Sequence, residues 1–265
     1  MNPTNTETIT CPCGASFEWD REQRDEFGFP PWVPSLCPEC TTASNRAREE
    51  SDRLERQARI DGEVSRLRAA VQHATPPLFL TTDINHPEFN ARAWDRLKGW
   101  APTAVKPFLG FVGPTGGCKS RIAYLLAGAE LERVLLARMA WEPSSQTTSH
   151  PTFVFAPSYQ IGEQVMRQFA GDDTVKRQAR AWLDKLRRAD LVWIDDLGKG
   201  RQSPAVASEL FAIVDHRHTH QASMIWTSNS TAEEIASRFD REVAADMAAP
   251  FAGRLNESSR ICKFS

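Results

Sequence analysis

The chain has 265 residues, of which 41% are hydrophobic and 25% are charged, and its formal net charge is -2. This length accommodates one α/β domain of ordinary size and a small additional module. No stretch approaches the run of about 18 apolar residues that a membrane helix requires, and the near-neutral charge gives no overall case for nucleic-acid binding. The N-terminus lacks the basic start and the apolar run of a secretory signal, so we expect a cytoplasmic protein with no membrane partner.

The N-terminal segment, residues 1–44, is rich in proline and cysteine and shows little hydrophobic periodicity, which predicts a small module built from loops. Its cysteines form one C-x-C pair and one C-x₂-C pair, and they are Cys11, Cys13, Cys37 and Cys40. Four thiolates close a tetrahedral Zn²⁺ shell, and metal binding folds a segment that has almost no core of its own. We therefore predict a structural zinc site, with four reduced thiols in a tail as the alternative.

The same segment carries seven acidic and two basic residues. A surface with this charge repels phosphate and favours a protein partner over a nucleic acid.

A highly charged stretch, residues 45–75, follows the cysteine module. Its apolar residues are spaced 4, 3 and 4 apart, as expected for a helix with one narrow apolar seam, and they are Ile60, Val64, Leu67 and Val71. We interpret it as a helical linker, with a partner-binding coiled coil as the alternative. It ends at Pro76 and Pro77, because proline lacks the amide proton that a helix needs.

Residues 76–265 are predicted to form the main domain. Apolar strands alternate there with helical patterns, and the expected strands span residues 108–112, 153–156, 191–194 and 224–227. Alternation of this kind predicts an α/β fold with a mostly parallel sheet covered by helices on both faces.

The sequence GPTGGCKS, residues 113–120, lies between an apolar strand and an amphipathic helix. It matches the pattern G-x-x-x-x-G-K-[ST], in which backbone N–H groups and a helix N-terminus wrap a phosphate. Cys118 stands where the last glycine is expected, and we expect the loop to tolerate a small side chain there if its φ is negative. The predicted nucleotide-binding residues are Gly113, Pro114, Thr115, Gly116, Gly117, Cys118, Lys119 and Ser120.

Chemical roles follow from these residue types. Lys119 is expected to reach the β- and γ-phosphates, and the Ser120 hydroxyl to ligate Mg²⁺. The sequence LVWIDDLG, residues 191–198, predicts a buried strand that ends in two acids. Without the glycine loop upstream, the preferred interpretation would be a strand followed by a solvated acidic turn. We assign Asp195 to Mg²⁺ and Asp196 to the general base, and we expect slow hydrolysis because Asp196 is one methylene shorter than the glutamate commonest in this role.

Asn229 follows the fourth strand in the sequence WTSNS, and we predict that it orients water against the γ-phosphate, a turn residue being the alternative. Thr231 and Glu234 have the spacing of a capping box, which predicts a helix start. The D-x-x-G at residues 195–198 also matches GTPases, but no [NT]-K-x-D motif occurs in the chain, so ATP is favoured over GTP.

Five stretches, GPTGGCKSR, WIDDLG, LFAIVDHR, WTSN and FAGRLNESSRICKF, lie within residues 76–264, the part of the chain that the resemblance covers. In their order and spacing they resemble the replicative helicase loaders of the DnaC/DnaI type and the related IstB transposition helpers, which are AAA+ ATPases. The resemblance implies a P-loop AAA+ three-layer sandwich. It also implies an arginine that completes the ATP site of a neighbouring subunit. Arg254 matches that arginine, and Arg260 is the second candidate. The alternative for either residue is an arginine on the surface without this role.

The resemblance further implies function and partners. DnaI-type loaders carry an N-terminal zinc module that contacts the helicase, so the expected partners are a replicative hexameric helicase, single-stranded DNA and other copies of the chain. We expect ATP-dependent helicase loading, self-association through the ATP site and Arg254, and no C-terminal lid. The alternatives are an IstB-like ATPase that assembles on duplex DNA and a zinc adaptor that senses nucleotide without hydrolysing it.

Overall fold

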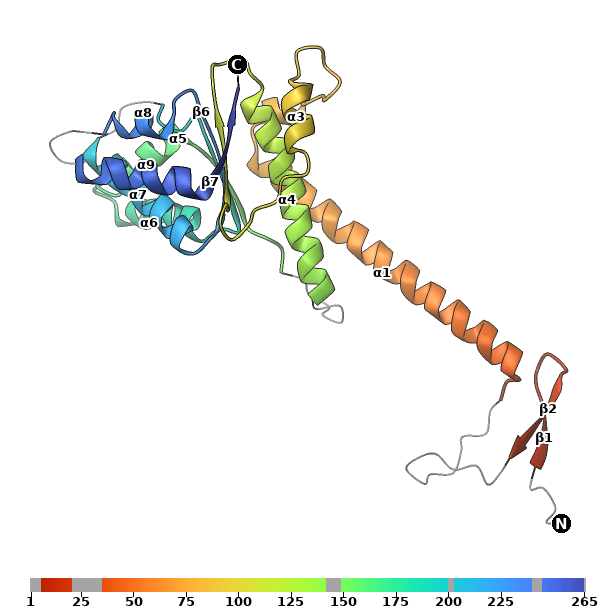
Figure 1. Ribbon diagram of the computed structural model, residues 1–265. Coiled ribbons are helices and arrows are strands. Elements are labelled where there is room, and N and C mark those ends of the chain that lie inside the picture. Colours follow the sequence, from red (N-terminus) through yellow and green to blue (C-terminus); the bar gives the residue numbers. More distant parts are fainter. Residues whose placement is uncertain (1–5, 21–34, 142–148, 200–202, 240–244, 265) are drawn as a thin grey trace. The chain divides into compact units, whose positions relative to one another are not determined.

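The computed structural model describes residues 6–20, 35–141, 149–199, 203–239 and 245–264. The chain divides into two compact units, residues 1–62 and 63–265 (Figure 1). Helix α1 (Pro38–Ala74) contributes residues to both of them. Among the described helices, none combines the length and the apolar character that crossing a bilayer requires.

The N-terminal unit contains an antiparallel hairpin of strands β1 (Thr6–Thr10) and β2 (Ser16–Asp20), followed by the first turns of α1. Ile9 lies opposite Phe17, so the apolar side chains of the two strands share one face. The expectation of a module built from loops is therefore wrong, because it contains two strands and the start of a helix, with its cysteines in the turn between the strands and at the helix start. Gly62 lies inside α1 without ending it, at a cost of about 1 kcal/mol relative to alanine.

The second unit is built on a five-stranded sheet with the order β4-β5-β6-β3-β7. Every pair of neighbouring strands is parallel. The strands are β3 (Phe108–Val112), β4 (Phe153–Pro157), β5 (Leu191–Asp195), β6 (Ser223–Ser228) and β7 (Ser259–Lys263). The four strands predicted from the sequence are confirmed to within about one residue at each end.

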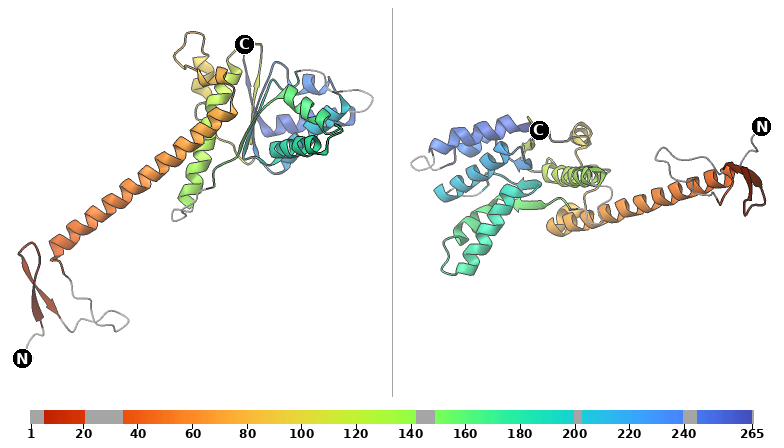
Figure 2. Two further views of the ribbon diagram at one scale, coloured as in Figure 1. Left: turned by 180° about the vertical axis from the view of Figure 1, so that it is seen from behind. Right: turned by 90° about the horizontal axis from the view of Figure 1, so that it is seen from below.

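Helices cover both faces of this sheet, with α4 on one side and α5 to α9 on the other (Figures 1 and 2). The helices of this unit are α2 (Pro77–Leu80), α3 (Ala91–Leu97), α4 (Lys119–Trp141), α5 (Ser158–Arg167), α6 (Asp173–Arg188), α7 (Pro204–Thr219), α8 (Ala232–Ala236) and α9 (Ala245–Ser258). The predicted α/β fold, a P-loop sandwich of three layers, is confirmed. Helix α8 begins with the predicted capping box of Thr231 and Glu234.

Side chains of the central strands alternate between the two faces of the sheet. Val192 and Ile194 belong to the apolar core under α5 to α9, whereas Trp193 points to the opposite face, because successive residues of a strand do so. The Trp193 ring lies 5.2 Å from the Phe79 ring of α2 and 4.6 Å from the Phe155 ring of β4, measured between centroids. This aromatic cluster holds α2 against the sheet, and α2 forms part of the site described next.

Candidate nucleotide site and metal centre

The loop between β3 and α4 contains the predicted phosphate-binding residues. Gly113 has φ 152°, and a Cβ atom there would lie 2.3 Å from the backbone oxygen of Phe264, so any side chain would displace β7 or the residues after it. Gly116 has φ 91°, a conformation that glycine adopts at little cost. These two glycines let the backbone turn sharply at the carboxyl end of β3.

Cys118 is the last residue of the loop, and its carbonyl accepts the first hydrogen bond of α4, from Ile122 N at 3.0 Å. Its φ is 61°, so the negative φ under which the loop was expected to tolerate a small side chain is not present. The left-handed conformation costs a residue with a Cβ about 1–2 kcal/mol, because the Cβ approaches the following carbonyl oxygen. The Cys118 thiol donates a hydrogen bond to Glu88 O at 3.2 Å, a contact that glycine cannot make.

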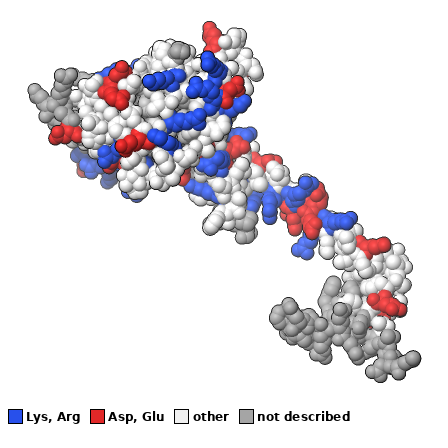
Figure 3. Space-filling view, viewed as in Figure 1, with Lys and Arg blue, Asp and Glu red and all other residues white. Residues whose placement is uncertain are grey.

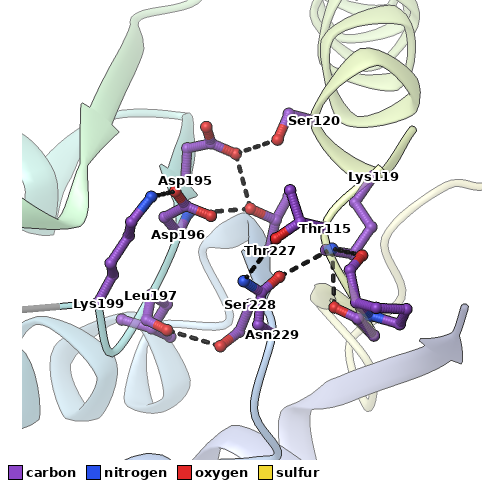
Figure 4. A network of polar contacts seen from close by, with 12 residues as sticks. Thr115, Lys119, Ser120, Asp195, Asp196, Leu197, Lys199, Thr227, Ser228 and Asn229 are labelled. Carbon is purple, nitrogen blue, oxygen red and sulfur yellow. Dashed lines mark hydrogen bonds and ion pairs between the residues drawn. The ribbon is translucent and has the colours of Figure 1, made fainter. Parts of the chain in front are cut away.

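Lys119, the first residue of α4, is buried and bends back over the loop (Figure 4). Its Nζ atom donates to the carbonyl oxygens of Gly113 at 2.8 Å and Pro114 at 2.7 Å, and to the side-chain oxygen of Asn229 at 3.0 Å. Burial lowers the pKa of Lys119, and the nearby acidic residues oppose that shift. The Asn229 amide in turn donates to the Thr115 hydroxyl at 3.2 Å. The structure thus brings Asn229, which follows β6, against the glycine loop.

Asp195 ends β5 beside the first turn of α4. Its Oδ1 atom accepts hydrogen bonds from the hydroxyls of Ser120 and Thr227, each at 2.6 Å. Burial raises the pKa of Asp195, and these two hydrogen bonds oppose the shift. Hydroxyl and carboxylate oxygens are ligands that Mg²⁺ accepts, so the pair predicted from the sequence fits this cation. Sequence reasoning missed Thr227, although its position at the end of the strand next to β5 was a usable signal.

Asp196 stands in the turn after β5, with φ 55°. Its backbone N–H donates to the Thr227 hydroxyl at 3.0 Å, and its carboxylate accepts a hydrogen bond from Lys199 Nζ at 2.7 Å. The predicted general base therefore lies in an ion pair with a lysine that the sequence reading did not single out. Figure 4 shows both side chains beside Asp195 and Thr227.

A cavity of about 610 Å³ opens over these residues, a size in the range of small-molecule and cofactor sites. The glycine loop, Asp196, Lys199 and Asn229 line one part of it. The segment between residues 78 and 89 lines another part, through Leu78, Phe79, Thr81, Asp83, His86, Glu88 and Phe89. Sequence reasoning assigned this segment no role. The apolar run PPLFL directly after the linker was the signal that could have indicated a wall for the nucleotide base.

Arg254 lies on α9, where its guanidinium pairs with Asp215 and stands 5.1 Å from the centre of the Phe211 ring. Arg260 is exposed on β7, with its guanidinium 3.5 Å from the backbone oxygen of Arg96. Neither arginine is among the described residues that line the cavity of its own chain. Their roles toward a neighbouring subunit stay predictions.

The four predicted cysteine ligands meet in the N-terminal unit, and their sulfur atoms all lie within 4.8 Å of one another. The sulfurs of Cys13 and Cys37 are 3.8 Å apart, which matches the edge of about 3.8 Å that four sulfurs at about 2.3 Å from one ion would form. Backbone hydrogen bonds at Cys13 and then Cys37 lower the pKa of the Cys11 thiol to about 6, whereas side-chain hydrogen bonds with Cys13, Cys37 and Cys11 raise the pKa of Cys40 to about 12, so the fit to a metal rests on the sulfur positions. The residues present therefore fit a structural zinc ion.

Comparisons with known proteins identify solved structures that have a similar fold. No protein-family model and no curated protein matches the sequence. A crystal structure of DnaI is 16% identical, with a TM-score of 0.51, over 72% of this chain and 95% of that one. A crystal structure of the DnaC helicase loader has a lower TM-score of 0.44, with 17% identity over 74% of this chain and 99% of that one. A crystal structure of a putative primosome component from Streptococcus pyogenes serotype M3 has a TM-score of 0.46, with 14% identity over 74% of this chain and 96% of that one. The resemblance to DnaC/DnaI-type proteins that the motifs predict is confirmed at the level of the fold, which this chain shares with DnaI.

Proposed function

We propose that this chain is an ATPase that places a replicative hexameric helicase on single-stranded DNA. The nucleotide part rests on the convergence of Lys119, Ser120 and Asn229 on one cavity, together with the hydrogen bond from Ser120 to Asp195. The helicase part is supported by the five motif stretches that resemble DnaC/DnaI-type loaders and by the fold shared with DnaI.

Hydrolysis follows from the positions of these side chains. The N–H groups of the loop and Lys119 hold the triphosphate, and Ser120 and Asp195 would hold Mg²⁺, which neutralises charge on the phosphate oxygens when it is bound. The Asp196 carboxylate takes a proton from a water molecule as the water oxygen bonds to the γ-phosphorus. The bond from that phosphorus to the β,γ-bridging oxygen breaks, and ADP and inorganic phosphate leave. Asn229 orients the γ-phosphate and the water.

Arg254 and the four cysteines are assigned to contacts with other protein chains. Arg254 acts on the ATP site of a neighbouring copy, where a guanidinium stabilises the charge that develops on the γ-phosphate. The four cysteines hold Zn²⁺, and the acidic N-terminal module that they fold contacts the helicase.

A basic surface supports contact with DNA. Lys and Arg side chains gather over α3 and β7 on the face seen in Figure 3. The exposed cations of α3, its C-cap and β7 are Arg92, Arg96, Lys98, Arg260 and Lys263. Such a surface attracts the phosphate backbone of a nucleic acid without reading its sequence.

A loading assay tests the proposal. The hexameric replicative helicase of the same cell is mixed with a forked DNA whose single strand is coated with single-strand binding protein, and unwinding is followed by strand separation. We expect unwinding to require this chain and ATP, and to be lost with Lys119→Ala and with Cys37→Ser. Equal unwinding with and without the wild-type chain would overturn the loader function.

The same proteins distinguish the alternatives. ATP-dependent filaments on duplex DNA in the absence of helicase, seen by electron microscopy, would identify an IstB-like helper instead. Saturable ATP binding without any phosphate release would identify the zinc adaptor.

A further inference from the structure

Lys199 is a second lysine in the cavity, in addition to the lysine of the glycine loop. Its Nζ atom lies 2.7 Å from Oδ2 of Asp196, and both residues line the cavity together with Lys119 and Asn229 (Figure 4). The hydrogen bond and the charge of Asp196 raise the pKa of Lys199, so its ammonium group stays protonated at neutral pH. A fixed positive charge therefore stands beside the predicted general base.

The backbone that carries Lys199 is held in place. Leu197 N donates to Thr227 O at 2.7 Å, and Lys199 N donates to Asp196 O at 3.0 Å, which closes a tight turn. Gly198 has φ 83° in this turn, and a Cβ atom there would lie 2.7 Å from the Ile235 side chain. Because the turn is fixed while 73% of the lysine side chain is exposed, the ammonium group can change partners without a backbone movement.

The ion pair itself is weak. Pairs between exposed lysines and carboxylates contribute about 0–1 kcal/mol, since water screens them. The γ-phosphate of ATP carries more negative charge than one carboxylate and would enter the same cavity. While Oδ2 of Asp196 accepts the hydrogen bond from Lys199, the ammonium group also occupies a position from which a water molecule could donate to that oxygen.

We propose that Lys199 exchanges partners: it pairs with Asp196 in the absence of ATP and binds the γ-phosphate when ATP enters, which frees the Asp196 carboxylate for the attacking water. ADP has no γ-phosphate and leaves the ion pair intact. Lys199 thus makes the site prefer ATP over ADP and exposes the general base only when there is substrate to hydrolyse. This inference rests on the proposed ATPase function and assigns a residue to its regulation.

The test measures the affinities of ATP and ADP, each with Mg²⁺, by calorimetry on the full chain. For Lys199→Ala we expect the Kd for ATP to rise about fivefold, the equivalent of about 1 kcal/mol, and the Kd for ADP to stay within about twofold. Lys199→Arg retains the charge and keeps the preference for ATP. The control is Lys176→Ala, because Lys176 is also a lysine paired with an aspartate three residues away, Asp173 at 3.0 Å, but lies outside the cavity.

The outcomes separate this inference from the function on which it rests. If Lys199→Ala weakens ATP and ADP equally, or weakens neither, partner exchange is wrong while ATP binding by the chain stands. If the wild-type chain binds neither nucleotide, the proposed function and the exchange are both wrong. A selective loss of ATP affinity that the control does not share supports the exchange.

Discussion

The hydroxyl of Ser120 and the carboxylate of Asp195 share a hydrogen bond, with 2.6 Å between Oγ and Oδ1. This contact joins the first turn of α4 to the carboxyl end of β5, where parallel strands of an open α/β sheet place their ligands. The cost of burying Asp195 is visible in its raised pKa. A buried carboxylate that destabilises the folded state is expected where a cation is to be bound, and the first prediction follows from it.

Asp195→Asn is expected to stabilise the nucleotide-free protein at neutral pH and to abolish Mg²⁺-dependent hydrolysis. Burial raises the pKa of Asp195 above its ordinary 3.8, so the folded state binds this proton more tightly than the unfolded state does. The free energy of unfolding therefore falls as the pH rises from about 3.8 through the folded-state pKa. Asparagine carries no charge to bury, so the free energy of unfolding of the variant should not decrease in this way as the pH rises. Urea denaturation between about pH 4 and pH 7 checks it, and identical pH profiles for wild type and variant would contradict the account.

Replacing Cys118 tests the strained loop residue. Cys118→Gly removes the strain of φ 61° but also the thiol contact to Glu88 O, so we expect ATP affinity at least equal to that of wild type. Cys118→Val adds a branched Cβ in the same conformation and is expected to be about 1–2 kcal/mol less stable than the glycine variant. Thermal and urea unfolding of the two variants gives this difference. Equal stability of valine and glycine would show that the left-handed conformation is not occupied.

Removal of zinc should unfold the N-terminal unit alone. Cys37→Ser takes one sulfur from the cluster, so bound zinc is expected to fall well below the value of about one ion per chain for wild type, measured by atomic emission. The Tm of residues 63–265, which form their own compact unit, should not change. Cys262→Ala, which removes a thiol outside the cluster, should keep the metal. Full zinc content in the Cys37 variant would count against the site.

Mixed assemblies test whether Arg254 acts between copies. Arg254→Ala and Lys119→Ala alone are each expected to lower ATP turnover by about 10³-fold or more. Mixing the two variants should restore part of the turnover, because one kind of interface then combines an intact Lys119 with an intact Arg254. The matched control mixes Lys119→Ala with Asp196→Asn, whose residues belong to the same chain's cavity and leave no complete site. Recovery in the control, or none in the test mixture, would contradict a role in trans.

The sheet and the glycine loop could be predicted because their signals are local. Apolar runs of four or five residues bounded by glycine or acidic residues favour strands over the longer helices. Asp195 ends one such strand, and Lys119 follows another after the glycine loop. The hairpin of the N-terminal unit was missed, since only Ile9, Phe17 and Trp19 mark its apolar face and the other face is polar. Two strands this short give a weak alternation signal.

Contacts made through tertiary packing could not be predicted. The segment lining the cavity depends on Phe79, which packs on Trp193 from a distant strand. The Asp196–Lys199 pair depends on the positive φ of Asp196, which the sequence does not encode in an obvious way because most residues with a Cβ avoid it. The positive φ of Cys118 could not be predicted for the same reason, because residues with a Cβ mostly avoid this conformation.

The most direct measurement of the central claim is a calorimetric titration of the full chain with ATP and Mg²⁺, compared with Lys119→Ala. The Lys119 ammonium group is buried against the glycine loop, and a bound phosphate would replace one of its three present hydrogen-bond partners, so we expect saturable binding by wild type and none by the variant. Circular dichroism confirms that the variant is folded. No saturable binding by wild type, or equal binding by the folded variant, would contradict a nucleotide site at residues 113–120.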